Sequence, residues 1–228
     1  MKNIKRKIIP LSLCVSMILG SQLFAENTNT LLEEITISQE QSNSASNNVT
    51  EGTGSYTTKS MKTATKLDLS IRETPQSIVV ITKQQMEDFN YTSLEDIINN
   101  TAGLNPSKFG TESVYMTARG FEIDYYQIDG IPTSRYTPVI DLSIYDRIEV
   151  VKGANGLMTG AGNPAASINM VRKHANSKEF TGKATISAGS WDTYRGDFDI
   201  STPLNSDGSV RGRIVSSYGE KDSYKNYY

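Results

Sequence analysis

Few side chains in this sequence have the type and spacing that catalysis requires. His174 is the only histidine, and it lies in a polar stretch, residues 172–176. Cys14 is the only cysteine, and it lies in an apolar run near the N-terminus. A single histidine argues against a Ser-His-Asp triad, and so small a set of soft ligands argues against a metal cage. We therefore expect no catalytic residues and no metal site, and we interpret His174 as a surface residue.

Two other features of the sequence could carry chemistry. Residues 153–163 are rich in glycine, as phosphate-binding loops are, but they lack the G-x-x-x-x-G-K-[ST] pattern. We interpret these glycines as serving tight turns and close packing. Arg147 and Glu149 could act as an acid–base pair, but the sequence offers no other catalytic residue to accompany them. We therefore interpret them as residues with a structural role. The sequence does not predict an enzyme.

The charge balance limits the kinds of partner. The 228 residues carry a formal net charge of −2, and 37% of them are hydrophobic. Four basic residues, Lys2, Lys5, Arg6 and Lys7, lie within the first seven positions, and without them 19 basic residues stand against 25 acidic ones. Binding of nucleic acid needs clustered lysine and arginine, so we do not expect it here.

The first 60 residues do not have the pattern of a folded core. Residues 1–25 are typical of an export signal, with a basic start, an apolar run at 8–19 and cleavage after Ala25. The apolar run is too short to span a bilayer as a helix. Residues 26–60 are polar and are expected to be flexible. Within them, residues 31–38 alternate apolar and polar side chains, which fits either a strand added to a partner's sheet edge or an incidental apolar patch.

Residues 61–176 have the pattern of a compact domain that positions the charged residues. The apolar run at 78–81 predicts a buried strand. Further strands are predicted at residues 114–118, 125–128, 144–151 and 167–172. In residues 147–150 charged and apolar side chains alternate, which predicts one buried face and one face of paired charges.

Two short helices are predicted in the same domain. Thr82 and Gln85 have the spacing of a capping box, and so do Thr92 and Glu95. The second helix is expected to bury residues 94, 97 and 98 on one face and to stop at Gly103.

Residues 177–228 change to a period of two. Three segments of about ten residues, near 180–189, 193–201 and 209–218, alternate apolar with charged or small side chains, and turn sequences separate them. Strands of this length with apolar residues outward are typical of a transmembrane β-barrel. A soluble antiparallel sheet with one wet face would give the same alternation, and the export signal favours the barrel.

An ordered set of motifs resembles one family, the TonB-dependent siderophore receptors. Residues 34–38 resemble a TonB box, the short segment by which such receptors are coupled to the inner membrane. The stretches that resemble the plug domain of these receptors are 72–78, 118–121 with 126–132, and 145–153, which continues through 156–164 to 168–173. The stretches at 72–77, 119–130 and 157–164 most resemble receptors for ferric hydroxamate and pyoverdine-type siderophores.

The resemblance implies a fold and a function. The expected fold is an α+β plug domain, a small mixed sheet with short helices, followed by the first antiparallel strands of a transmembrane β-barrel that is truncated in this chain. The family's barrel has about 22 strands and encloses the plug. The expected function is uptake of ferric siderophores across the cell outer membrane, with TonB as partner, the siderophore as transported ligand and no cofactor.

The resemblance also assigns roles to individual residues. Glu34, Ile35, Thr36, Ile37 and Ser38 would form the TonB box. Plug loops that reach the outer face would contact the ligand, and the candidates are Phe109, Glu112, Arg135 and Tyr136. An arginine beside a tyrosine suits hydrogen bonding and stacking with a siderophore, although an ordinary solvated loop has the same composition. Arg119, Arg147 and Glu149 would form charge pairs within the plug and to the barrel wall.

Some alternatives stay open at this stage. The cargo could instead be cobalamin, another metal chelate or a sugar, and a plug alone could serve as a periplasmic binding module. About eight residues separate the expected cleavage site from the TonB box, which leaves no room for a signalling domain and favours transport without transcriptional signalling. Three strands cannot close a barrel, so this chain alone is not expected to transport.

Overall fold

The computed structural model describes residues 48–109, 113–133, 140–153 and 164–222. The predicted export signal and the predicted TonB box, residues 34–38, lie outside the described residues. No helix within the described ranges is long and apolar enough to cross a membrane.

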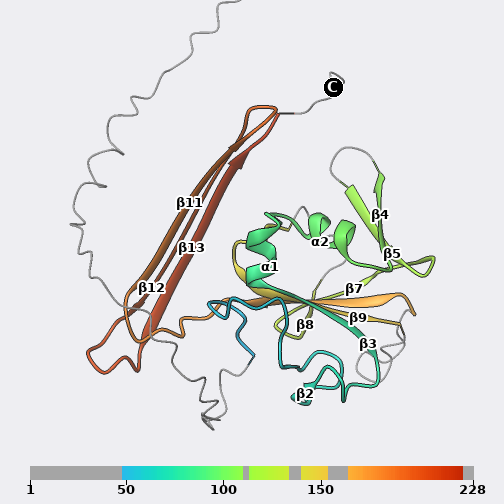
Figure 1. Ribbon diagram of the computed structural model, residues 1–228, viewed down its shortest axis with the longest axis horizontal. Helices are drawn as coiled ribbons and strands as arrows, with labels where there is room; N and C mark the ends of the chain where they lie inside the picture. The colour runs from blue at the N-terminus through green and yellow to red at the C-terminus, as the bar shows by residue number, and fades with distance from the viewer. Residues whose placement is uncertain (1–47, 110–112, 134–139, 154–163, 223–228) are drawn as a thin grey trace, which may run out of the picture. The chain divides into compact units, whose positions relative to one another are not determined.

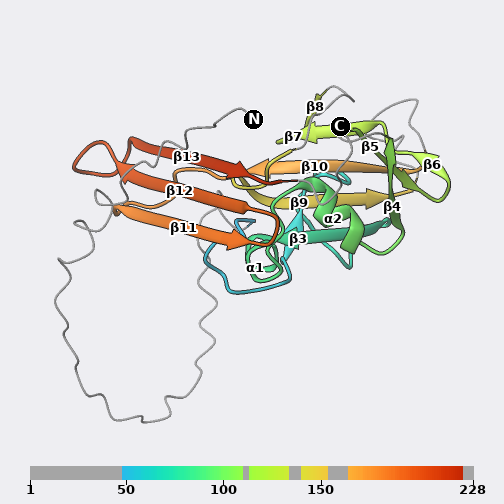
Figure 2. The same cartoon turned by 90° about the horizontal axis from the view of Figure 1, so that it is seen from above.

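A five-stranded mixed sheet forms the centre of the plug region (Figure 1). Its strands, in spatial order, are β3 (Ser77–Thr82), β9 (Tyr145–Lys152), β10 (Ala166–Arg172), β7 (Tyr125–Ile128) and β8 (Ile131–Thr133). The pair β10–β7 is parallel, and the other three pairs are antiparallel. Figure 2 shows β3, β9, β10 and β7 lying side by side. The predicted strands at 78–81, 125–128, 144–151 and 167–172 are all members of this sheet.

The two faces of this sheet differ in chemistry. Directly opposite residues on neighbouring strands share a face, so the register assigns the side chains. One face is apolar and carries, among others, Val79, Ile81, Ile148, Val150, Ile168 and Met170. The other face carries a polar row across three strands, Glu149, Asn169 and Gln127, beside a small apolar cluster of Met61, Ala64, Val80 and Val151. The sequence predicted that β9 would have one buried face and one face of paired charges. Both faces of β9 are buried, so the charged face is covered as well.

Two short helices supply side chains to the apolar face. Helix α1 (Lys83–Asp88) is capped by Thr82, whose side chain accepts the Gln85 amide as predicted. Its Met86 is 1% exposed and belongs to the main core cluster. Helix α2 (Leu94–Asn100) buries Leu94, Ile97 and Ile98 in the same cluster.

The capping box of α2 is displaced by one residue from the predicted pair Thr92 and Glu95. Ser93 is the N-cap, and Ser93 and Asp96 form the reciprocal box. The reason is tertiary: the Thr92 carbonyl accepts the Leu142 amide, and Ser93 forms a bridge with Asp141. Residue 92 is thereby held in an extended pairing and cannot begin the helix.

Two smaller sheets complete the plug region. Strands β4 (Leu104–Phe109), β5 (Ser113–Ala118) and β6 (Phe121–Glu122) form an antiparallel sheet, and β5 includes the strand predicted at 114–118. Strands β1 (Ser60–Met61) and β2 (Leu69–Ser70) pair with each other, and Met61 packs in the small apolar cluster.

The last three described strands form a separate antiparallel sheet, β11 (Thr181–Gly189), β12 (Thr193–Pro203) and β13 (Arg211–Glu220). Its register places Ala184 opposite Phe198 and Ile200 opposite Ile214 on one face. Large apolar side chains of that face are exposed, for example Ile186 at 90% and Tyr218 at 73%. Residues 190–192 connect β11 to β12, and in this turn Trp191 and Asp192 have positive φ angles of 61° and 47°.

Candidate functional site

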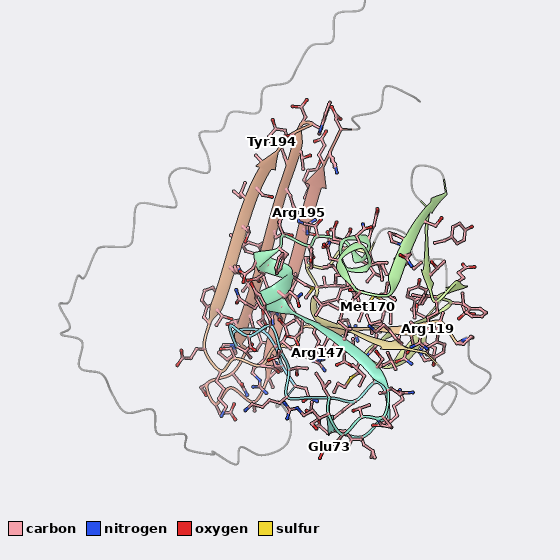
Figure 3. The ribbon with its side chains drawn as sticks, turned by 45° about the vertical axis from the view of Figure 1, so that its right-hand side comes forward. Glu73, Arg119, Arg147, Met170, Tyr194 and Arg195 are labelled. Carbon is pink, nitrogen blue, oxygen red and sulfur yellow. The ribbon has the colours of Figure 1, made fainter. Side chains whose placement is uncertain are left out.

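An ion cluster centred on Arg147 lies within the buried sheet (Figure 3). The Arg147 Nε donates to Glu149 Oε1 at 2.6 Å, and Arg147 Nη1 donates to Asp146 Oδ2 at 3.1 Å. Exposed fractions are 8% for Arg147, 1% for Glu149 and 3% for Asp146. Charges so deeply buried require pairing and hydrogen bonds, and removal of Arg147 would leave two buried carboxylates without this cation.

Thr63 links this cluster to the segment that precedes the sheet. Its hydroxyl donates to Glu149 Oε2, and Asn169 Nδ2 donates to Thr63 Oγ1 at 2.7 Å. The other amide atom of Asn169, Oδ1, accepts the Gly130 N–H at 2.9 Å. The polar face of the sheet therefore holds the segment around Thr63 by directional bonds as well as by the packing of Met61.

Residues 50 and 51 are tied to the same cluster from the N-terminal side. The backbone N–H groups of Thr50 and Glu51 donate to the Asp146 carboxylate, at 3.1 and 2.8 Å to Oδ1. The Thr50 hydroxyl donates to the Asp146 carbonyl at 2.8 Å and accepts the backbone N–H of Lys83, the first residue of α1, at 3.0 Å. The described end of the segment expected to be flexible, residues 26–60, is thus bonded to both the sheet and α1.

Ion pairs join the plug region to one face of β11–β13. Arg195 donates to Asp141 at 2.7 Å, Lys183 contacts Glu87 at 2.7 Å, Lys173 contacts Asp199 at 2.7 Å, and Arg213 contacts Glu51 at 2.6 Å. Asp199 also accepts from Arg213 at 2.7 Å, so one carboxylate serves two cations. Residues 195, 197 and 199 alternate with the exposed apolar residues of β12, so this sheet presents charge to the plug and apolar surface away from it.

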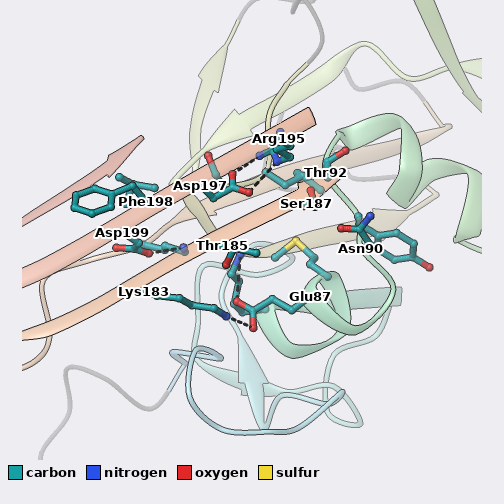
Figure 4. A pocket seen from close by; sticks show the side chains of 17 residues that line it. Glu87, Asn90, Thr92, Lys183, Thr185, Ser187, Arg195, Asp197, Phe198 and Asp199 are labelled. Atoms are coloured by element: carbon teal, nitrogen blue, oxygen red, sulfur yellow. Dashed lines mark hydrogen bonds and ion pairs between the residues drawn. The ribbon is translucent and has the colours of Figure 1, made fainter. Parts of the chain in front are cut away.

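A cavity of about 300 Å³ lies between α1 and the charged face of these strands (Figure 4). Its charged lining residues are Lys83, Glu87, Lys173, Lys183, Arg195, Asp197 and Asp199. Burial and the nearby ammonium group of Lys173 lower the pKa of Lys83. Apolar residues, among them Met86 and Leu142 of the plug core, also line the cavity.

Arg119 lies at the turn between β5 and β6, with φ of 55°. Its guanidinium lies over Gly153, where a Cβ would come 2.9 Å from Nη1. Gly153 has φ of 98°, so the backbone conformation favours glycine there, whereas the Arg119 guanidinium is the end of a flexible side chain that could shift. At this position the interpretation of the glycine-rich stretch as close packing agrees with the geometry.

The sequence of this central region matches a known domain. Residues 70–167, which contain β3, both helices, β9 and the Arg147 cluster, match the family model of the TonB-dependent receptor plug domain. These residues form a TonB-dependent receptor plug domain. Two partners of the cluster, Thr63 and Asn169, lie just outside the matched range of the plug.

Curated relatives of this plug-containing chain are siderophore receptors. The ferripyoverdine receptor of Pseudomonas aeruginosa is 46% identical over 187 residues, which are 79% of this chain and 23% of the receptor. The ferric-pyoverdine 358 receptor of Pseudomonas putida is 45% identical over 186 residues, 78% of this chain and 23% of that receptor. The chain thus spans about a quarter of the length of the curated relatives it matches.

Solved structures give the same relationship. The pyoverdine outer membrane receptor FpvA of Pseudomonas aeruginosa PAO1 superposes with a TM-score of 0.74 at 46% identity, over 77% of this chain and 26% of that one. The alcaligin outer membrane receptor FauA of Bordetella pertussis superposes with a TM-score of 0.71 at 44% identity, over 76% of this chain and 31% of that one. The predicted fold class, an α+β plug followed by antiparallel strands, is confirmed.

The structure brings some predicted site residues of the plug together. Arg147 and Glu149 form the ion pair described above, and Arg119 lies over Gly153. Phe109 is the last residue of β4. Glu112, Arg135, Tyr136 and the TonB-box residues lie outside the described residues, and their roles stay predictions.

Several residues that hold the plug were not singled out from the sequence. They are Thr50, Glu51, Thr63, Asp146 and Lys173. Asp146 precedes Arg147 in the most specific motif, so its charge was visible, but its partners at 50 and 51 lie about 95 residues away. The alternation of apolar and charged residues in β12 predicted its charged face, which includes Asp199. A search for the partner of Asp199 would have led to Lys173.

Proposed function

We propose that this chain is the gate and tether of an outer-membrane receptor that takes up ferric siderophores with energy delivered through TonB. The supporting geometry is the sheet β11–β13, whose exposed apolar face suits lipid and whose charged face is ion-paired to the plug. A plug bonded in this way blocks a barrel until force displaces it. The pyoverdine receptors among the relatives favour a siderophore as cargo.

The proposed handle for that force is the segment Glu34, Ile35, Thr36, Ile37 and Ser38. An extended segment of this kind can add as a strand to the edge of a partner's sheet, where backbone hydrogen bonds resist pulling together. TonB would provide the sheet edge. Proline lacks the N–H that such pairing requires.

The test of the handle is binding of the purified chain to the carboxy-terminal domain of TonB. Ile35→Pro and Ile37→Pro should each weaken binding by at least about tenfold, because each removes a ladder hydrogen bond and disturbs the extended pairing. Ser44→Pro, outside the segment but in the same polar stretch, is the matched control. Equal affinity of all three variants and the wild type would refute the assignment of the handle.

The test of the cargo is growth of the iron-starved host lacking this gene, complemented with the gene and supplied with one ferric siderophore at a time. Rescue by a pyoverdine or hydroxamate complex is the expected result. Each alternative cargo, namely cobalamin, another metal chelate or a sugar, is tested in medium that lacks the corresponding nutrient. Rescue by one of these alone would assign that cargo instead.

The proposed ligand contacts are Phe109, Glu112, Arg135 and Tyr136. A binding titration with the siderophore that rescues growth should show weaker binding for Arg135→Ala and Tyr136→Ala, because each loses a hydrogen-bonding or stacking group. Wild-type affinity of both variants would remove these two residues from the site.

A further inference from the structure

The cavity between α1 and β11–β13 has an unequal charge lining. Its wall carries four cations, Lys83, Lys173, Lys183 and Arg195, against three anions, Glu87, Asp197 and Asp199. Arg195 forms ion pairs with Asp197 and with Asp141, which is not a lining residue of the cavity. The excess positive charge therefore lies at the end of the cavity with the three lysines.

Within the cavity lining, the three lysines share two carboxylates, Glu87 and Asp199. Lys183 contacts Glu87 at 2.7 Å, and Lys83 contacts the same carboxylate at 3.7 Å. Lys173 is bonded to Asp199, which Arg213 also contacts. Lys83, only 14% exposed at its side chain, has the longest distance of the three to its nearest paired carboxylate and lies in the cavity wall. Burial first, and then the ammonium groups of Lys173 and Lys183, lower the pKa of Lys83.

Residues 50 and 51, at the start of the described chain, contact residues of this cavity and its surroundings in two ways. Glu51 makes a two-pronged pair with Arg213, at 2.7 and 2.6 Å, and its carboxylate is 4.0 Å from the Lys173 ammonium. Thr50 accepts the backbone N–H of Lys83. Displacement of residues 50 and 51 would thus remove one negative charge from beside Arg213 and Lys173 and would release the first residue of α1.

We propose that this cavity is a binding site for anionic, carboxylate-type groups on the route between plug and barrel wall, and that withdrawal of Glu51 raises its affinity. The proposal rests on the proposed function, because it takes the tether as the part that is pulled. Once Glu51 leaves, Asp199 alone neutralises Arg213 and Lys173, and the excess positive charge at the lysine end increases by one. The same pull that loosens the plug would then prepare a place for an anionic cargo group.

The experiment measures citrate binding to the purified full chain in detergent by calorimetry. Glu51→Gln imitates withdrawal of the charge without force, and it should bind citrate about fivefold or more tightly than the wild type, because one neutralising charge is lost at short range. Glu73→Gln makes the same charge change at an exposed residue bonded to Ser70, and it should bind as the wild type does. Equal affinities of the Glu51 and Glu73 variants would overturn the proposal.

Arg213→Gln separates the charge effect from simple loosening of the plug. It breaks the same ion pair from the strand side but removes a cation, so citrate should bind no more tightly than to the wild type. Tighter binding in both Glu51→Gln and Arg213→Gln would mean that loosening alone opens the cavity, and the proposal would be wrong.

The position of the anion is tested at Lys83. Lys83→Met in the Glu51→Gln background should return citrate affinity to the wild-type value or below. In the unmutated chain, saturating citrate should slow acetylation of Lys83 relative to Lys66, read by mass spectrometry. Unchanged affinity in the double variant together with unprotected Lys83 would place the anion elsewhere.

Failure of the cavity site and failure of the proposed function give different results. If the chain binds TonB through residues 34–38 but citrate does not respond to Glu51, the receptor function stands and the cavity site fails. If citrate binds as expected but TonB does not, the site stands and the coupling to TonB fails.

Discussion

The Asp146 carboxylate accepts the backbone N–H of Thr50 across 96 residues of sequence, at 3.1 Å to each of its oxygens. The neighbouring Glu51 N–H binds the same carboxylate at 2.8 Å, and the Arg147 guanidinium balances its charge. A tension applied at the N-terminal segment therefore reaches the central sheet first at Asp146. The plug is held at this point by charge-assisted hydrogen bonds, which are stronger and more directional than apolar contacts.

Replacement of Asp146 should release the N-terminal segment. Asp146→Asn should lower the free energy of unfolding by about 1.5–3 kcal/mol, because the N–H groups of Thr50 and Glu51 lose a charged acceptor while Arg147 keeps its pair with Glu149. Amide hydrogens of residues 50–55 should also exchange faster, which mass spectrometry detects. Asp207→Asn, in the exposed β12–β13 turn, is the control and should change neither quantity. Unchanged exchange at residues 50–55 in Asp146→Asn would contradict the role given to this carboxylate.

The Thr63 hydroxyl should be worth more than an exposed threonine hydroxyl. Thr63→Val keeps the shape but removes the hydroxyl that binds Glu149 Oε2 and Asn169 Nδ2, and it should cost about 1–3 kcal/mol of unfolding free energy. Thr65→Val removes an exposed hydroxyl bonded to the Leu67 carbonyl and should cost within about 0.5 kcal/mol. Urea unfolding of both variants measures the difference, and similar costs would show that the bond to Glu149 contributes little.

The N-cap of α2 is Ser93 and not the preceding Thr92, so the two residues can be compared directly. Ser93→Ala should destabilise the domain by about 1 kcal/mol, because it removes the N-cap oxygen. Thr92→Ala removes only a weak contact of its hydroxyl with Asp96 at 3.4 Å and should cost less. Thermal unfolding of the two variants ranks them, and a larger loss for Thr92→Ala would restore the register predicted from the sequence.

The two glycines Gly130 and Gly196 should respond to alanine with opposite signs. Gly130 has φ of 79° in the Asp129–Gly130 turn, and its Cβ would meet the Lys66 Nζ at an ordinary 3.6 Å, so the cost of Gly130→Ala is backbone strain of about 1–2 kcal/mol. Gly196 has no positive φ, and a Cβ there meets nothing within 4 Å. Gly196→Ala should stabilise by about 0.4–1 kcal/mol through the unfolded state. Denaturant midpoints of the two variants measure both changes in stability, and equal shifts would refute the predicted difference in sign.

Local patterns were enough to predict most elements of the plug. The apolar run at 78–81 and the alternation in 145–152 are set by which side chains must be buried, and the structure has strands there. The helix start at Thr82 was predicted because its cap is local. The start at Ser93 was not, because pairing with residues 140–142 decides it. Local sequence has no information about a partner that the fold brings in from elsewhere.

The candidate site shows the same division more sharply. Arg147 and Glu149 are two residues apart on one strand, so their pairing is visible in the sequence. Thr50 with Asp146 and Glu51 with Arg213 are 96 and 162 residues apart, and nothing in either local stretch predicts the other. The first bond depends on the N-terminal segment being placed against β9, and the second on its being placed against β13, and a single sequence specifies neither.

The position of β10 in the sheet has a consequence for the timing of folding. β10 is the last plug strand in the sequence, yet it lies between β9 and β7 and pairs with both. The pairs β3–β9 and β7–β8 therefore have no connection within the sheet until residues 166–172 have been synthesised. Pairings over such long sequence separations form slowly. A nascent chain of this design remains unfolded, and hence competent for translocation through a narrow export channel, until nearly the whole plug has been made.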